Sequence, residues 1–243
     1  MKSLVIGGSA GLGRQLAGRL AERGDELVLV ASDTRDLEPV AADLRARHGI
    51  SVTTIVQDLG GPDAATLKMR IVEAAGVPDY VFYVAGLGHL DDTGNLPQTD
   101  IDRLIDVNFR SALSLLNAFF PDMEQGAIRT VVCVGSVASA RGRGSNMVYA
   151  AAKCGLTFYA EALRHRLAAS SCCVQTYLVG FMDTTMLDGR APKLPPVAPE
   201  EIARRIVRNL DRDIGAVYVP AWWLLATTIL RLLPWWIFKR VNL

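Results

Sequence analysis

The chain lacks several features that mark particular classes of protein. Its 243 residues include only four cysteines, and none of them forms a Cys-x-x-Cys pair, so we expect neither a zinc site nor a disulfide framework. Charge of one sign is lacking as well, because 26 basic side chains face 25 acidic ones and leave a net charge of +1. Such a surface does not attract nucleic acid, so we expect no polynucleotide partner. We expect no metal centre either, since the cysteines lack metal-ligand spacing.

Long apolar runs are also missing. Met1-Lys2-Ser3 leads straight into a strand-like segment, without the basic, apolar and small-residue parts of a secretory signal. The apolar run 221–230 has half of the ~20 residues that cross a bilayer, so we expect no transmembrane helix. Together with reduced thiols, these features predict a cytoplasmic protein. No internal repeat or linker divides the chain, and its length gives no room for a separate substrate domain.

Short apolar segments alternate with helical patterns along most of the chain, which predicts a parallel sheet with helices on both faces. The expected fold is α/β, a Rossmann-type doubly wound sheet of about seven strands. We expect residues 1–220 to form the catalytic domain and residues 221–243 an apolar tail with a helix. The strand-like segments are Leu4–Ile6, Leu27–Val30, Val52–Val56, Tyr80–Val84, Ile128–Val134, Val174–Val179 and Val217–Val219.

Three polar residues describe a proton-transfer site. Tyr149 and Lys153 are four positions apart, so on a helix they share one face, and Ser136 lies thirteen residues before the tyrosine. An ammonium group near the phenol would lower the tyrosine pKa towards neutral pH, where a general acid/base works best. Ser136 would hold the substrate oxygen. Taken alone, the spacing also fits a solvated helix face.

A glycine-rich turn near the N-terminus predicts a phosphate site. Gly7, Gly11 and Gly13 stand between an apolar strand and a helix with leucines at helical spacing. Glycine lets the backbone approach a pyrophosphate, and the following helix offers unpaired N–H groups to it. A simple tight turn is the alternative.

These residues together make the chain similar to the short-chain dehydrogenase/reductase family, over nearly its whole length. The family's catalytic Asn, Ser, Tyr and Lys correspond to Asn108, Ser136, Tyr149 and Lys153. The sequence departs from the family at Tyr83-Val84-Ala85-Gly86, where Asn-Asn-Ala-Gly is usual, and at Val179-Gly180, where Pro-Gly is usual. The resemblance implies hydride transfer between a nicotinamide and a ketone or secondary alcohol, with Tyr149 as the proton donor in reduction.

The expected cofactor is NAD(P). The resemblance implies a cofactor site made of Gly7, Ser9, Gly11, Leu12, Gly13, Ser32, Asp33, Arg35, Asp58, Leu59, Ala85, Gly86, Tyr149, Lys153, Gly180 and Thr184. The choice between NAD and NADP stays open, because Asp33 would favour a free 2′-hydroxyl whereas Ser32 and Arg35 could hold a phosphate. Asp58 is either an adenine contact or a helix cap. The proline-rich segment from Gly189 to Pro199 is expected to cover the substrate.

All four tryptophans lie in the tail, between Trp222 and Trp236, together with Arg231, Lys239 and Arg240. Two interpretations stay open for it: packing in a homodimer or homotetramer, and peripheral contact with a membrane surface. The tail also resembles short-chain reductases that act on polyprenylphosphoryl 2-keto-pentoses, which implies a hydrophobic or lipid-linked substrate.

Two other functions remain as alternatives. One is a non-catalytic dinucleotide-binding scaffold, which loss of turnover on replacing Tyr149 would separate from an enzyme. The other is a nucleotide-sugar epimerase or dehydratase, which shares Tyr-x-x-x-Lys but carries a larger substrate domain after the position of Gly180.

Overall fold

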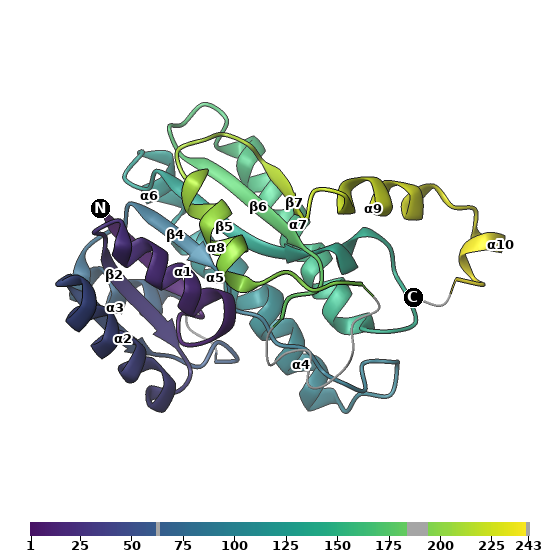
Figure 1. The fold of residues 1–243 in the computed structure, drawn as a ribbon, viewed down its shortest axis with the longest axis horizontal. Helices are drawn as coiled ribbons and strands as arrows, with labels where there is room; N and C mark the ends of the chain where they lie inside the picture. The colour runs from purple at the N-terminus through teal and green to yellow at the C-terminus, as the bar shows by residue number, and fades with distance from the viewer. Residues whose placement is uncertain (62–63, 184–193, 242–243) are drawn as a thin grey trace.

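The computed structural model describes residues 1–61, 64–183 and 194–241. Within them, seven parallel strands form one sheet in the order β3-β2-β1-β4-β5-β6-β7 (Figure 1). The predicted doubly wound parallel sheet is therefore confirmed, in a single domain. The strands are β1 (Lys2–Ile6), β2 (Glu26–Ala31), β3 (Val52–Val56), β4 (Tyr80–Tyr83), β5 (Thr130–Ser136), β6 (Cys173–Val179) and β7 (Ala216–Val219).

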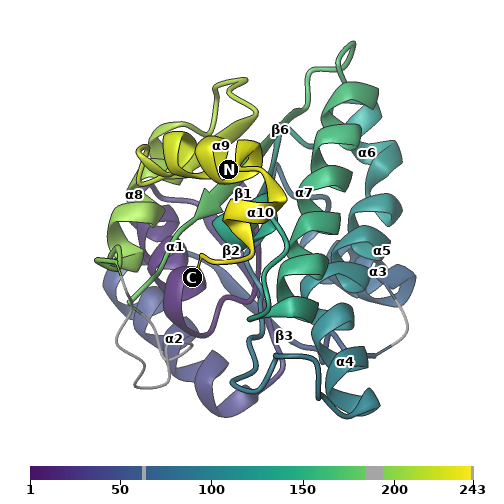
Figure 2. The same ribbon diagram turned by 90° about the vertical axis from the view of Figure 1, so that its right-hand side faces the viewer.

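Helices cover both faces of this sheet (Figure 2). One face carries α1 (Gly11–Glu22), α2 (Thr34–His48) and α8 (Pro199–Arg208), and the other carries α3 (Ala64–Ala75), α5 (Ser111–Ala118) and α7 (Met147–Arg166). The remaining helices are α4 (Gln98–Ile105), α6 (Phe120–Glu124), α9 (Trp223–Leu232) and α10 (Trp235–Phe238).

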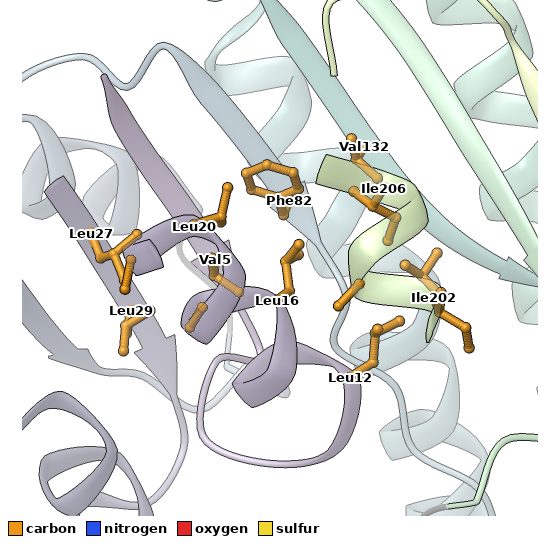
Figure 3. Packing of buried hydrophobic residues seen from close by; sticks show 14 of the residues in the cluster. Val5, Leu12, Leu16, Leu20, Leu27, Leu29, Phe82, Val132, Ile202 and Ile206 are labelled. Atoms are coloured by element: carbon orange, nitrogen blue, oxygen red, sulfur yellow. The ribbon is translucent and has the colours of Figure 1, made fainter. Parts of the chain in front are cut away.

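Two hydrophobic clusters fill the space between sheet and helices. On the α1 side, Val5 packs with Leu16 and Leu20 of α1 and with Ile206 of α8 (Figure 3). Leu4 and Ile6, the neighbours of Val5 in β1, belong to the cluster on the other face, as the two-residue period of a strand requires. Burial on both faces explains why the strand sequences are continuously apolar.

The strand order reverses beside β1, which pairs with β2 on one side and with β4 on the other. In such sheets ligands bind at the carboxyl ends of the strands near this reversal. The turns that follow β1, β4 and β5 therefore meet at one edge, and they carry Gly7, Gly86 and Ser136.

Candidate active site at the carboxyl edge of the sheet

The turn after β1 approaches other backbone too closely for any residue but glycine. Gly7 has a φ of +93°, and a Cβ on it would lie 2.8 Å from the backbone of Ala85. A Cβ on Gly13 would lie 1.9 Å from the carbonyl oxygen of Gly7. No side chain caps the N-terminus of α1, whose first N–H groups are thus available to a phosphate. This backbone fits a pyrophosphate.

The side chains of two predicted cofactor contacts, Leu12 and Leu59, pack against the hydrophobic clusters. Leu12 is 5% exposed and its side chain belongs to the core under α1, so only its main chain faces the turn. Leu59 is partly buried against the cluster on the other face of the sheet. Ser9, in the turn itself, is half-buried.

Asp33 and Arg35 form an ion pair with each other after β2. The Arg35 guanidinium donates to Asp33 at 2.6 Å, and Asp33 also caps α2 by accepting from the N–H of Arg35 at 2.8 Å. Hydrogen bonding to Arg35 holds the pKa of Asp33 below its usual range. Asp33 thus already pairs with Arg35, the cation that the 2′-phosphate of NADP would need. Ser32, next to Asp33, is exposed.

Asp58, after β3, binds Arg103 of α4 at 2.6 and 2.7 Å and accepts from the N–H of Gly60 at 2.9 Å. The hydrogen bond from Arg103 lowers its pKa. Asp58 therefore joins the β3 turn to α4, a role that neither sequence interpretation includes.

Ser136 ends β5 and Tyr149 stands in the first turn of α7. The Ser136 hydroxyl is 8% exposed and accepts from the N–H of Ala138 at 3.1 Å, which caps a 3₁₀ turn at Val137–Ala140. Burial raises the pKa of Tyr149, and a hydrogen bond with Ser136 opposes that rise. Ser136 and the phenol of Tyr149 thus lie close enough for the serine to influence the tyrosine pKa.

Lys153 lies one helical turn further along α7 and is 3% exposed. Its ammonium donates to the carbonyl oxygens of Val134 at 3.1 Å and Ala85 at 3.3 Å. Burial lowers its pKa to about 8. It therefore spans the carboxyl ends of β4 and β5.

The expectation that Lys153 lowers the pKa of Tyr149 is wrong for this structure. Desolvation is the largest influence on the phenol and raises its pKa, and Ser136 supplies the opposing interaction. The physical reason is that Lys153 directs its protons to two carbonyl groups, which hold it at the strand ends.

Asn108 lies in a π-helical turn, Asp106–Arg110, between α4 and α5. Its amide nitrogen donates to the carbonyl oxygens of Leu87 at 2.7 Å and Leu104 at 3.0 Å, and its oxygen accepts from the N–H of Leu87 at 3.1 Å. Asn108 thereby fixes the turn after β4, where the sequence has no asparagine of its own. Turns of this kind are frequent at functional sites.

Gly86 stands between Lys153 and Asn108. A Cβ there would lie 3.2 Å from the lysine ammonium nitrogen and 3.3 Å from the asparagine side-chain oxygen. A side chain would thus fill the space beside the two polar groups. Glycine therefore lets the backbone pass close to both polar groups.

Sequence reasoning missed Asp92, a buried carboxylate that caps α7. Its two oxygens accept from the N–H groups of Val148 and Tyr149, each at 2.9 Å, and its carbonyl oxygen accepts from Met147. The preceding residue, Asn146, has a φ of 55° and makes no side-chain cap. Asp92 therefore takes over the capping and fixes the helix turn that carries Tyr149.

Gly180, after β6, is covered by the start of α9. A Cβ on Gly180 would lie 2.1 Å from the indole nitrogen of Trp223, so only glycine fits under this ring. The predicted contact Thr184, and the part of the predicted cover from 189 to 193, lie outside the described residues. Of that cover, Val197 is buried against the α1 side of the sheet.

The carboxyl edge of this sheet thus holds the groups expected of a nucleotide-binding oxidoreductase. The family model "short chain dehydrogenase" matches residues 2–194, and the chain belongs to this family.

Two bacterial relatives support this assignment. An uncharacterized oxidoreductase of Myxococcus xanthus is 31% identical over 185 residues, which cover 76% of this chain and 73% of that protein. An uncharacterized oxidoreductase of Mycobacterium tuberculosis is 30% identical over 248 residues, covering 98% of this chain and 96% of that protein. Some other relatives are longer proteins, and the matched part of this chain spans only 34% of their length.

Among solved structures, a short-chain dehydrogenase from Sphingobium yanoikuyae in complex with NADPH superposes with a TM-score of 0.84. It is 27% identical, and the match covers 99% of this chain and 96% of that one.

Proposed function

We propose that this protein interconverts a ketone and a secondary alcohol with NAD(P), and that Tyr149 is the general acid/base. Two neighbouring groups of residues support the proposal. Tyr149 lies near Ser136. Gly86 lies next to both Lys153 and Asn108. These are the groups that carbonyl reduction needs: a proton donor, a second hydroxyl on the substrate oxygen and a binding space for the cofactor.

The bound nicotinamide would supply or accept the hydride. Ser136 would hold the carbonyl oxygen, and Tyr149 would give its proton to the alkoxide that develops there during reduction. Because burial raises the pKa of Tyr149, the phenol is protonated at neutral pH and ready to act as an acid. The hydrogen bond with Ser136 then stabilises the phenolate that remains. Lys153 and Gly86 would hold the nicotinamide ribose, and Gly7, Gly11 and Gly13 the pyrophosphate.

The substrate, we propose, is hydrophobic and carries a negatively charged group, as a lipid-linked ketone would. Arg143 lies in the loop between Ser136 and Tyr149 and is half-buried. Burial lowers its pKa, and no acidic group of the described residues opposes that shift. A half-buried guanidinium without a carboxylate is costly unless a ligand supplies the opposite charge.

We also propose an oligomeric state and a cellular location. A cytoplasmic homodimer or homotetramer agrees with four free cysteines and with Phe158, an apolar side chain that is 74% exposed on α7. The tail 221–243 is proposed as a separate contact surface of the catalytic domain 1–220.

The test is oxidation of NADPH and of NADH by purified protein with pairs of ketones matched in length. One member of each pair carries a carboxylate or phosphate, and the other a neutral polar group. We expect turnover, with a lower KM for the long anionic ketones, and an increase of about tenfold in that KM in Arg143→Gln. Binding of dinucleotide without turnover of any ketone would favour the scaffold instead.

A further inference from the structure

The C-terminal helices expose an unusual amount of apolar surface. We define the C-terminal apolar surface as Trp222, Leu224, Leu225, Ile229, Leu232, Trp235 and Trp236. Leu232 is 77% exposed, Trp235 69% and Leu225 66%. In α9 Thr227 is the buried residue, and in α10 it is Phe238. Single exposed apolar residues are ordinary, but seven within fifteen positions indicate an interaction site.

Polar contacts contribute to holding these helices in place. Arg141 donates to the carbonyl oxygens of Leu230 and Leu233, both at 2.6 Å, and its guanidinium stacks 3.8 Å from the ring centre of Phe238. Arg231 donates to the carbonyl oxygen of Ala140 at 3.0 Å. The large apolar side chains of α9 and α10 are thus left facing outwards, and Figure 1 shows the two helices extending beyond the sheet.

This surface lies beside the candidate active site. Strand β7 is parallel to β6, so α9 leaves from the carboxyl edge of the sheet, where Ser136 and Gly86 also lie. Trp223 covers Gly180 at the end of β6, and Arg141 belongs to the segment directly after Ser136 and its 3₁₀ turn. The helices therefore contact two of the loops around the site.

Charge distinguishes between the partners that could cover this surface. The sequence has no Asp or Glu after Asp213, whereas Arg231, Lys239 and Arg240 are exposed within or beside the apolar surface. In a two-fold dimer the same patch would face itself, which brings cations towards cations with no acidic group in the segment to pair with them. An anionic lipid headgroup supplies the missing charge.

The residue types also fit a bilayer surface. Tryptophan prefers the headgroup level, with lysine and arginine at the phosphate groups and leucine below them. None of the helices in the described part of the chain has the length and apolar character needed to cross a membrane. With ten residues in α9 and four in α10, the segment can lie along the surface.

We propose that α9 and α10 dock the protein onto an anionic bilayer surface through the C-terminal apolar surface. Docking brings the carboxyl edge of the sheet close to the lipid, so that a substrate dissolved in the membrane reaches the site without crossing water. The docking itself is independent of catalysis, whereas the delivery of substrate rests on the proposed function.

The test is co-sedimentation of the full chain with vesicles of phosphatidylcholine alone and of equal parts phosphatidylcholine and phosphatidylglycerol. We expect binding to the mixed vesicles at least about tenfold tighter than to the neutral ones, weakening as salt is added. Leu225→Glu and Trp236→Glu should each reduce this binding by about tenfold or more. Lys239→Gln together with Arg240→Gln should remove most of the preference for the anionic lipid.

Met69→Glu is the matched control, because Met69 is 64% exposed on α3 and lies outside the tail, and it should leave vesicle binding unchanged. Turnover of a water-soluble ketone, measured without vesicles, should be unchanged in all these variants, which shows that they fold.

No binding to the mixed vesicles, or equal binding to both kinds, would overturn the proposal. So would a change from dimer to monomer in Leu225→Glu without loss of vesicle binding, because a second copy would then be the partner. A protein that binds vesicles but reduces no ketone would contradict only the proposed function.

Discussion

At the scale of single residues, two glycines on α1 differ in the space that they leave for a side chain. Gly13 has no room for a side chain, because a Cβ would lie 1.9 Å from the carbonyl oxygen of Gly7. Gly18, on the same helix, has no atom within 4 Å of such a Cβ. The first is needed for the cofactor turn, whereas the second only weakens the helix.

We therefore predict that Gly13→Ala weakens the binding of NADPH by about tenfold or more, because the turn after β1 must move. Gly18→Ala should bind NADPH normally and raise the free energy of unfolding by about 0.5–1 kcal/mol. Cofactor titration and urea unfolding of the two variants test both parts. Normal binding by Gly13→Ala would show that the turn does not contact the dinucleotide.

At the scale of the helix, Asp92 fixes α7 from a distant part of the chain. Replacing Asp92 by Asn leaves one good acceptor for the two N–H groups of Val148 and Tyr149. We predict a loss of about 1–2 kcal/mol in stability and a lower kcat with little change in the KM for NADPH, since the first turn of α7 orients Tyr149.

The neighbouring exposed residue provides the control. Asp91→Asn should change neither stability nor kcat, because within the described chain Asp91 makes its hydrogen bonds through its backbone. Chemical denaturation and steady-state kinetics measure both variants. Equal behaviour of Asp92→Asn and Asp91→Asn would contradict a positioning role for Asp92.

The elements were predictable from the sequence to different degrees. Each β-strand was predicted, because β-branched runs between glycine or helical segments are local signals. Tyr149 and Lys153 could be placed on one helix from their spacing. The cap from Asp92 could not, because it joins positions 56 apart, and the π-turn around Asn108 depends on its bonds to Leu87. The attachment of α9 by Arg141 spans 89 positions and carries no local signal either.

At the scale of the whole molecule, the buried Lys153 makes stability depend on pH. Its folded pKa is about 8, below its ordinary value of 10.5, because burial disfavours the charged ammonium. Between these two values the unfolded chain binds more protons than the folded one, so the contribution of Lys153 to stability increases as the pH rises. Below about pH 8 both states are charged and the penalty is constant.

We predict that the wild type gains stability relative to Lys153→Met as the pH rises from about 8 to about 10.5. Both proteins should carry Cys133→Ala, because burial raises the pKa of this thiol to about 12 and its titration changes stability in the opposite direction. Lys153 also influences the thiol pKa, so the effect of Cys133 would not cancel between the two proteins otherwise. Urea unfolding across this pH range measures the difference. A constant difference between the two proteins would contradict a depressed lysine pKa.

The most direct measurement concerns Tyr149. Tyr149→Phe removes only the hydroxyl that would move the proton, so we predict a loss of about 10²–10⁴-fold in kcat for ketone reduction with unchanged NADPH binding. Tyr159→Phe, on the same helix but partly buried against the core, is the control and should retain activity. If Tyr149→Phe reduces ketones as fast as Tyr159→Phe, Tyr149 is not the general acid and the proposed mechanism is wrong.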